Sequence, residues 1–176
     1  MKTTQERIFL LLMGVCVLQI LYYAPHMPER MASHFNSAGD PNGWSTRTVF
    51  FVLYGAMLNI LFLAFRVLPS LFPRFSDNII NLPNKAYWLA PERRAATFFL
   101  IKERMVFLGN GVLIFFIATF QLVLMANLTD TRRMNAEVIW LVLACLLMFT
   151  MAWTFTFIRL FRMPPAKKWI KYLSDS

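Results

Sequence analysis

Charged residues are scarce in this chain. Asp, Glu, Lys and Arg make up 15% of its 176 residues, against about 25% in ordinary soluble domains. Apolar residues make up 58%, where soluble domains carry roughly 45–50%. A chain of this length cannot bury so much apolar surface in one water-soluble core. The shortage of charge therefore excludes an ordinary soluble domain and predicts an integral membrane protein.

Cysteine and histidine are also scarce, with two of each. Cys16 and Cys145 fall within long apolar segments, where neither is placed for a disulfide in a loop, and two isolated thiols make no metal set. His26 and His34 lie outside those segments, so no span offers an imidazole to a haem or a quinone. We therefore expect no cofactor.

The residue patterns of common enzyme classes are missing. The chain has no H-E-x-x-H motif, no glycine-rich phosphate loop and no pair of carboxylates within an apolar segment. Ser33 precedes His34, but adjacent residues do not generally present a nucleophile and its base to each other, and no third orienting acid is evident. No charged residue lies at the middle of a span, which argues against an ion- or proton-coupled carrier. We expect neither an enzyme nor a carrier.

What the chain does have is four apolar segments long enough to cross a membrane, at about residues 8–23, 49–68, 105–126 and 138–160. At about 1.5 Å of rise per residue, each reaches or approaches the ~30 Å hydrocarbon thickness. With no repeats or linkers, the sequence predicts one all-α domain over residues 1–176, a bundle of four transmembrane helices. Gly55 lies one turn before Asn59 on the same face of the second helix, which predicts close packing and a hydrogen bond between helices there.

Basic residues are distributed unevenly between the two sides of these segments. The N-terminus, the connection between spans 2 and 3 and the C-terminus together carry fourteen Lys and Arg, while the other two connections carry four, namely Arg30, Arg47, Arg132 and Arg133. Because cytoplasmic loops are enriched in Lys and Arg, this distribution predicts that both termini lie in the cytoplasm. The connection between spans 1 and 2 is then external.

The net charge of +9 does not indicate a nucleic-acid partner, because these basic residues lie where membrane orientation and anionic lipid attract them. The C-terminal tail interleaves Lys with aromatic residues, which is typical of a short helix on the inner leaflet. We expect the contacts with the inner membrane surface to come from Tyr87, Trp88, Lys167, Lys168, Trp169 and Lys171.

The external connection, residues 24–47, is polar and rich in turn-forming residues. Pro25 and Pro28 forbid continuation of the first helix. The sequence Asp-Pro-Asn-Gly at positions 40–43 predicts a turn, and Trp44 then returns the chain to the membrane interface. Residues 29–35 are consistent with a short helix or an extended segment, and periodicity does not decide between them.

His34 is the main candidate for a binding site in this connection. His26, Glu29 and Asp40 lie nearby, which is enough nitrogen and oxygen for a metal, although the spacing matches no known ligand motif. The alternative is that His34 orders the loop by hydrogen bonding and that Asp40 caps its own turn. A metal- or small-ligand-binding membrane protein therefore stays the alternative function.

Residues 28–44 resemble the signature of the domain of unknown function 1648, which opens the SdpI-type toxin-immunity membrane proteins. The residues that match the motif are Pro28, His34, Phe35, Gly39, Pro41, Gly43 and Trp44. Residues 81–94 also resemble the segment that follows the second span in short, stand-alone members of this family. Together the two motifs extend the resemblance over roughly residues 8–104.

The resemblance implies a bacterial inner-membrane protein that senses or resists an external peptide, although this chain lacks the C-terminal region of the SdpI-type proteins. Its spans carry little chemistry of their own. We therefore expect a non-catalytic protein that acts by contact with other membrane proteins. It would serve either as an accessory or structural subunit of a larger complex or as an immunity or sensor protein with an external peptide ligand.

Overall fold

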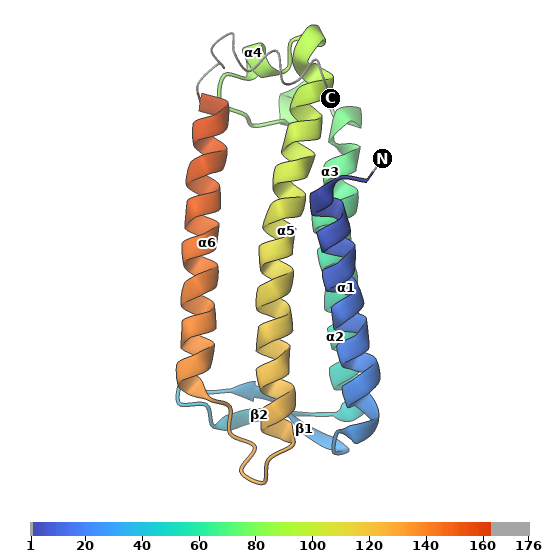
Figure 1. The fold of residues 1–176 in the computed structure, drawn as a ribbon, viewed down its shortest axis with the longest axis vertical. Helices are drawn as coiled ribbons and strands as arrows, with labels where there is room; N and C mark the ends of the chain where they lie inside the picture. Colours follow the sequence, from blue (N-terminus) through green and yellow to red (C-terminus); the bar gives the residue numbers. More distant parts are fainter. Residues whose placement is uncertain (1, 163–176) are drawn as a thin grey trace.

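The computed structural model describes residues 2–162, and four helices in this part of the chain are long and apolar enough to cross a membrane (Figure 1). The first half contains α1 (Thr4–Tyr23), a 3₁₀ turn η1 (Ala24–His26), strands β1 (Arg30–Phe35) and β2 (Pro41–Thr46), α2 (Arg47–Phe62), a π-helical turn η2 (Leu63–Val67) and α3 (Leu68–Leu71). The second half contains turns η3 (Phe72–Arg74) and η4 (Asp77–Ile79), α4 (Lys85–Trp88), α5 (Pro91–Asn127) and α6 (Ala136–Arg162).

Helix α1 begins four residues earlier than its apolar run because its first turn is capped. The Thr3 hydroxyl accepts a hydrogen bond from the Glu6 backbone N–H at 3.3 Å, and the Glu6 carboxylate accepts one from the Thr3 N–H at 3.3 Å, which is a capping box. Glu6 is only 3% exposed. Its carboxylate pairs with Lys102 at 2.6 Å and with Arg66 at 3.3 Å. These partners allow a charged residue to be buried at the end of a span.

Helix α5 extends well beyond the apolar run 105–126. It begins at Pro91, whose fixed φ suits the first helical position, and Glu92 lies in its first turn. The polar residues 92–104 therefore continue without a break into the third span.

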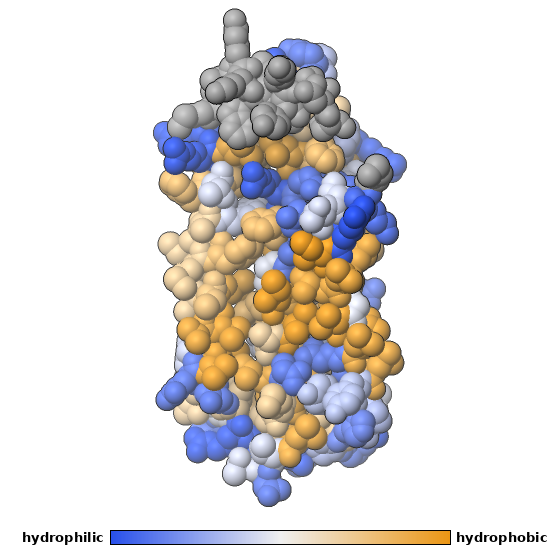
Figure 2. Space-filling model, viewed as in Figure 1, coloured by the Kyte–Doolittle hydropathy of each residue, from blue (hydrophilic) through white to orange (hydrophobic). Residues whose placement is uncertain are grey.

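Helix α5 stands between α6 on one side and α1 with α2 on the other (Figure 1). The central core is built by α1, α2 and α5, from Phe9, Cys16, Tyr54, Leu58, Val106, Leu113 and Phe116. The apolar window of α6 contains no buried residue, and Phe161 at its end belongs to a separate cluster. The expected bundle of four helices is thus a three-helix core with α6 packed beside it. An apolar band covers the middle of the molecule, with hydrophilic residues at both ends (Figure 2).

A buried polar network joins the three core helices. The Tyr54 hydroxyl donates to Gln19 Oε1, and Gln19 Nε2 donates to Gln121 Oε1 at 2.9 Å. Gln121 in turn donates to the Tyr23 hydroxyl at 2.5 Å. Each side-chain amide is therefore paired across helices, as polar groups in a membrane must be.

The predicted packing of Gly55 and Asn59 against another helix of this chain is wrong. Asn59 is exposed, and its amide donates to the Gly55 carbonyl of its own helix at 2.9 Å. Apart from the neighbouring part of α2 itself, no atom of the described residues lies within 4 Å of the position that a Gly55 side chain would take. The buried face of α2 carries Phe50, Tyr54 and Leu58 instead, and Gly55 and Asn59 each follow one of these by a single residue, about 100° around the helix.

Candidate functional site

The connection between α1 and α2 is a β-hairpin, which resolves the choice between helix and extended chain in favour of the latter. Strands β1 and β2 are antiparallel, with Ala32 opposite Trp44 and His34 opposite Gly43. The turn is not at 40–43 as predicted, because Pro41 and Gly43 are already part of β2. It is formed by residues 36–40, where the Asn36 side-chain oxygen accepts from the backbone N–H groups of Ala38 and Asp40. This is an Asx-type turn, and Asn36 caps it where Asp40 was expected to.

The hairpin is fixed to the helices by one buried amide. Asn127, the last residue of α5, is 3% exposed. Its Oδ1 accepts from the Ala32 N–H at 2.7 Å and its Nδ2 donates to the Ala32 carbonyl at 2.9 Å. The amide thus pairs with β1 as a neighbouring strand would. Sequence analysis missed this residue because its partner lies ninety-five positions away.

The hairpin turn also contacts the loop between α5 and α6. Gly39 has a φ of 84°, in the left-handed region that favours glycine. Its carbonyl accepts from the Met134 N–H at 2.9 Å, and a side chain at Gly39 would collide with the Met134 carbonyl. Asp40 forms an ion pair with Arg133 at 2.7 Å. The motif residues at the turn therefore dock the hairpin onto the second loop.

His34 lies on the exposed face of β1. Its Nδ1 is 3.1 Å from the Ser33 hydroxyl, and its ring packs over Gly43, where any side chain would approach His34 Cβ to 2.8 Å. The other groups considered as metal ligands have their own partners: His26 bonds to the Tyr22 carbonyl and Glu29 pairs with Arg47. Within residues 2–162, no three His, Cys, Asp or Glu side chains gather as a metal site requires.

Trp44 is 41% exposed, and two arginine side chains lie over its ring. The guanidinium groups of Arg30 and Arg132 lie over its ring at 5.0 and 5.4 Å from the centroid. Arg132 has a φ of 50° and donates to the Arg30 carbonyl at 2.8 Å. Neither arginine was recognised from the sequence as part of this site.

The remaining motif residues frame the hairpin. Pro28 precedes β1, and Pro41 opens β2 opposite Phe35. Phe35 lines a small hollow together with Trp140 of α6, whose indole N–H donates to the Ser37 carbonyl at 3.2 Å. The hairpin therefore contacts the start of α6 as well as the end of α5.

The segment 81–94, at the other end of the molecule, closes over the end of α6. Trp88 was expected at the membrane surface, but it is 5% exposed and its indole N–H donates to the Phe161 carbonyl at 2.8 Å. The Asn84 amide also donates to the last carbonyls of α6, those of Phe161 and Arg162. A helix end leaves its final carbonyls unpaired, so these donors complete α6 from outside. Tyr87 is half-buried beneath the Arg93 guanidinium at 4.2 Å.

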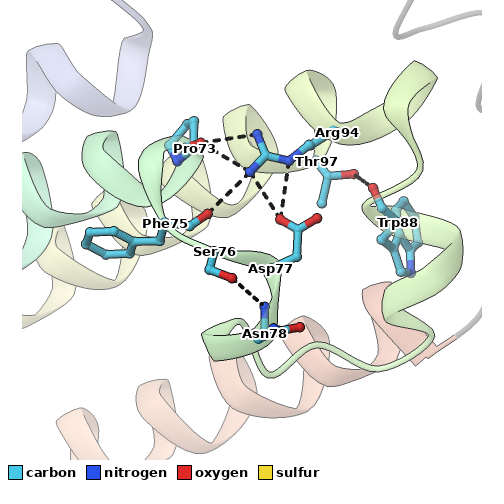
Figure 3. Close-up of polar contacts among 8 residues, drawn as sticks. All are labelled: Pro73, Phe75, Ser76, Asp77, Asn78, Trp88, Arg94 and Thr97. Atoms are coloured by element: carbon cyan, nitrogen blue, oxygen red, sulfur yellow. Dashed lines mark hydrogen bonds and ion pairs between the residues drawn. The ribbon is translucent and has the colours of Figure 1, made fainter.

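Arg94 organises the connection that leads into this segment (Figure 3). Its guanidinium donates to the carbonyls of Pro73 and Phe75 and pairs with Asp77 at 3.1 Å. Nearby, the Thr97 hydroxyl donates to the Trp88 carbonyl at 2.7 Å. The predicted surface residues Lys167, Lys168, Trp169 and Lys171 lie outside the described residues.

Comparison with known proteins gives one match, on the part of the chain that contains α1, the hairpin and most of α2. Residues 11–58 match the model of the domain of unknown function 1648. No curated protein and no solved structure matches the chain. The match confirms the family that the hairpin motif indicated, over a shorter range than the predicted 8–104. Residues 11–58 of this membrane protein are thus similar to the domain of unknown function 1648.

Proposed function

We propose that this protein is a non-catalytic membrane protein that binds a transmembrane helix of another protein through the Gly55–Asn59 face of α2. In this proposal it is an accessory subunit of a membrane complex. Its termini and the segment 75–90 face the cytoplasm of a bacterium, on the side that the distribution of Lys and Arg predicts. The hairpin then faces outward.

The observation that carries the proposal is an amide exposed to lipid in the middle of a span. Asn59 is exposed on α2, and among the described residues its side chain forms one hydrogen bond, from the amide N–H to the Gly55 carbonyl of its own helix. The notch at Gly55 is empty. A small residue one turn from an amide is the arrangement through which transmembrane helices approach closely and hydrogen-bond. A partner helix would fill the notch and pair with the side-chain carbonyl of Asn59.

The neighbouring surface of α2 supports this interpretation. Val52 and Ala56 of α2 and Leu63, the first residue of η2, are exposed one turn before, next to and one turn after the Gly55–Asn59 pair. They give an apolar stripe with small residues at its centre, suited to van der Waals packing. An isolated polar group facing hydrocarbon is unfavourable, so the exposed amide is better explained by a partner than by lipid.

The test is purification in mild detergent from native membranes, with mass spectrometry of the proteins that copurify. Asn59→Leu and Gly55→Leu should each remove the partner while leaving the melting temperature near that of the wild type, because neither side chain packs within this chain. Ala152→Leu is the control, since Ala152 is also exposed but lies on α6.

A stoichiometric companion lost in both α2 variants supports the proposal. A companion retained in both variants contradicts it. If the particle contains only copies of this chain, the accessory role is wrong. The immunity or sensor role, with a peptide bound at the external hairpin, is then the better explanation.

A further inference from the structure

A long apolar groove lies between α1, α5 and α6, because α5 separates the other two helices. Its volume is about 600 Å³, within the ~300–1,000 Å³ of typical ligand sites. The lining comes from Ile8 of α1, from Phe107, Ile114 and Ala118 of α5, and from Leu141 and Phe149 of α6, among others. Almost all of this surface is apolar, which suits a hydrocarbon chain.

The length of the groove distinguishes between two kinds of occupant. On α5 the lining extends from Phe107 to Ala118, about 16 Å at 1.5 Å of rise per residue. This is about half of the ~30 Å hydrocarbon thickness. A transmembrane helix crosses the whole thickness, whereas a lipid tail enters from one surface and ends inside the bilayer. The groove therefore fits a lipid tail that enters from the side of the termini.

A hollow that contains two charged residues adjoins the groove at that side. It has a volume of about 270 Å³ and is lined by Gln5, Leu100, Glu103, Arg104 and Phe107. Gln5 and Phe107 line the groove as well, so the two spaces meet at these residues. An apolar groove that opens into a charged hollow has the shape and polarity of a phospholipid.

The junction is held by a polar contact between α1 and α5. Asn110 is 5% exposed, and its Nδ2 donates to the side-chain oxygen of Gln5 at 2.8 Å. Asn110 Oδ1 has no hydrogen-bond partner among residues 2–162. The contact fixes Gln5 where the apolar lining gives way to the polar one.

The two charges in the hollow have opposite sign. Glu103 is half-buried and accepts from the Thr3 hydroxyl at 2.8 Å, which leaves its second carboxylate oxygen for a further donor. Arg104 is half-buried and forms no ion pair with another residue in the described part of the chain. An arginine complements a phosphate, and a carboxylate complements an ammonium group. A lipid with only a negative headgroup would pair with Arg104 and be repelled by Glu103.

We propose that this groove and hollow bind one phospholipid with a zwitterionic headgroup that ends in a primary ammonium group, as in phosphatidylethanolamine. One acyl chain lies between α1, α5 and α6. The phosphate pairs with Arg104 and the ammonium group donates to Glu103. The site is separate from the Gly55–Asn59 face and does not depend on the proposed partner.

The experiment is native mass spectrometry of the full chain in detergent, with phosphatidylethanolamine and phosphatidylglycerol of the same acyl chains added in equal amounts. The wild type should retain one phosphatidylethanolamine in preference to phosphatidylglycerol. Arg104→Gln should weaken retention of both lipids by about tenfold, since a charge-assisted hydrogen bond is lost. Glu103→Gln should remove the preference for phosphatidylethanolamine. Arg74→Gln is the control, because Arg74 is exposed and lies outside the hollow.

A second pair of variants tests the groove independently of the charges. Ile114→Trp fills it, and Ile114 is 57% exposed, so the fold should accept the larger side chain. Ile60→Trp is the matched control on α2, where the wild-type side chain is 56% exposed. Loss of the lipid in Ile114→Trp alone supports the site. Equal retention in the two tryptophan variants, or equal binding of the two lipids by the wild type, would overturn the proposal.

Discussion

At the scale of single residues, the hairpin depends on two side-chain identities, an amide at position 127 and the absence of a side chain at position 43. Asn127 replaces a missing neighbouring strand, and Gly43 leaves room for the His34 ring on the opposite strand. Both residues lie at the end of the molecule where the family motif is found. Their contacts give the motif a structural role that does not require a bound ligand.

Asn127→Ala should lower the free energy of unfolding by about 1–3 kcal/mol, because the N–H and carbonyl of Ala32 would be left buried and unpaired. The measurement is thermal unfolding in detergent, followed by circular dichroism. Asn42→Ala is the control, since Asn42 is exposed on β2 and has no side-chain hydrogen bond among the described residues. Equal melting temperatures for the two variants would contradict the anchoring role of Asn127.

Gly43→Ala should destabilise the protein by about 1–3 kcal/mol, as overpacking does elsewhere. The new methyl group would lie 2.8 Å from His34 Cβ and 2.9 Å from Nδ1. His34→Gly removes both atoms, so Gly43→Ala should be much less destabilising in that background. A double-mutant cycle of unfolding free energies measures this coupling. If the two substitutions are additive, His34 does not limit the size of residue 43.

At the scale of elements, α6 is the least buried of the four long helices. Specific hydrogen bonds along its length fix its position. The Trp140 indole reaches the hairpin, the Trp153 indole donates to the Arg104 carbonyl at 2.9 Å, and the Trp88 indole caps the last turn. Because little apolar surface of α6 is buried, these polar contacts set its position. These contacts thereby keep α6 at the distance from α1 that forms the groove assigned to a lipid.

Trp88→Phe keeps the aromatic ring but removes the donor to the Phe161 carbonyl. We expect a loss of about 1 kcal/mol for the end of α6, because the Phe161 carbonyl loses its 2.8 Å donor and keeps only the Asn84 amide at 3.4 Å. Hydrogen exchange measured by mass spectrometry should show faster exchange in the peptides near residue 161 and little change in α1. Tyr87→Phe is the control, since the Tyr87 hydroxyl has no hydrogen bond among the described residues. Unchanged exchange in Trp88→Phe would show that the aromatic packing alone fixes this end.

At the scale of the whole molecule, the hairpin and the segment 75–90 lie at opposite ends of the apolar band (Figures 1 and 2). A membrane around this band therefore places them on opposite sides. The orientation proposed above rests on the Lys and Arg residues, and most of those in the described part of the chain belong to the end where α1 begins and α6 ends.

Single cysteines test this orientation in a variant in which Cys16 and Cys145 are replaced by alanine. In intact cells, Ser37→Cys in the hairpin should react with a membrane-impermeant maleimide, and Asn78→Cys should react only after permeabilisation. Ser37 and Asn78 are both exposed, so a thiol at either position should be accessible to the reagent on its own side of the membrane. The reverse pattern of labelling would invert the orientation.

Much of the element structure follows from the sequence because it depends on local chemistry. Apolar length identifies all four spans, Pro91 marks the start of α5, and the hairpin motif indicates the family. The helix boundaries differ from the apolar runs mainly where polar residues continue a helix beyond the membrane. Glu6 is an example. Its charge excludes it from the apolar run, but in the fold it pairs with Arg66 and Lys102, so that α1 continues through it.

The sequence alone determined that this protein crosses a membrane with four helices and carries a polar element between the first two, because hydrocarbon tolerates only long apolar helices with paired backbone groups. Only the tertiary structure decided which polar residues meet. Asn127 with Ala32, Gly39 with Met134 and Trp88 with Phe161 are paired across long separations. In an apolar span every face has similar composition, so periodicity could not show that Gly55 and Asn59 face outward or that α6 stands beside the core.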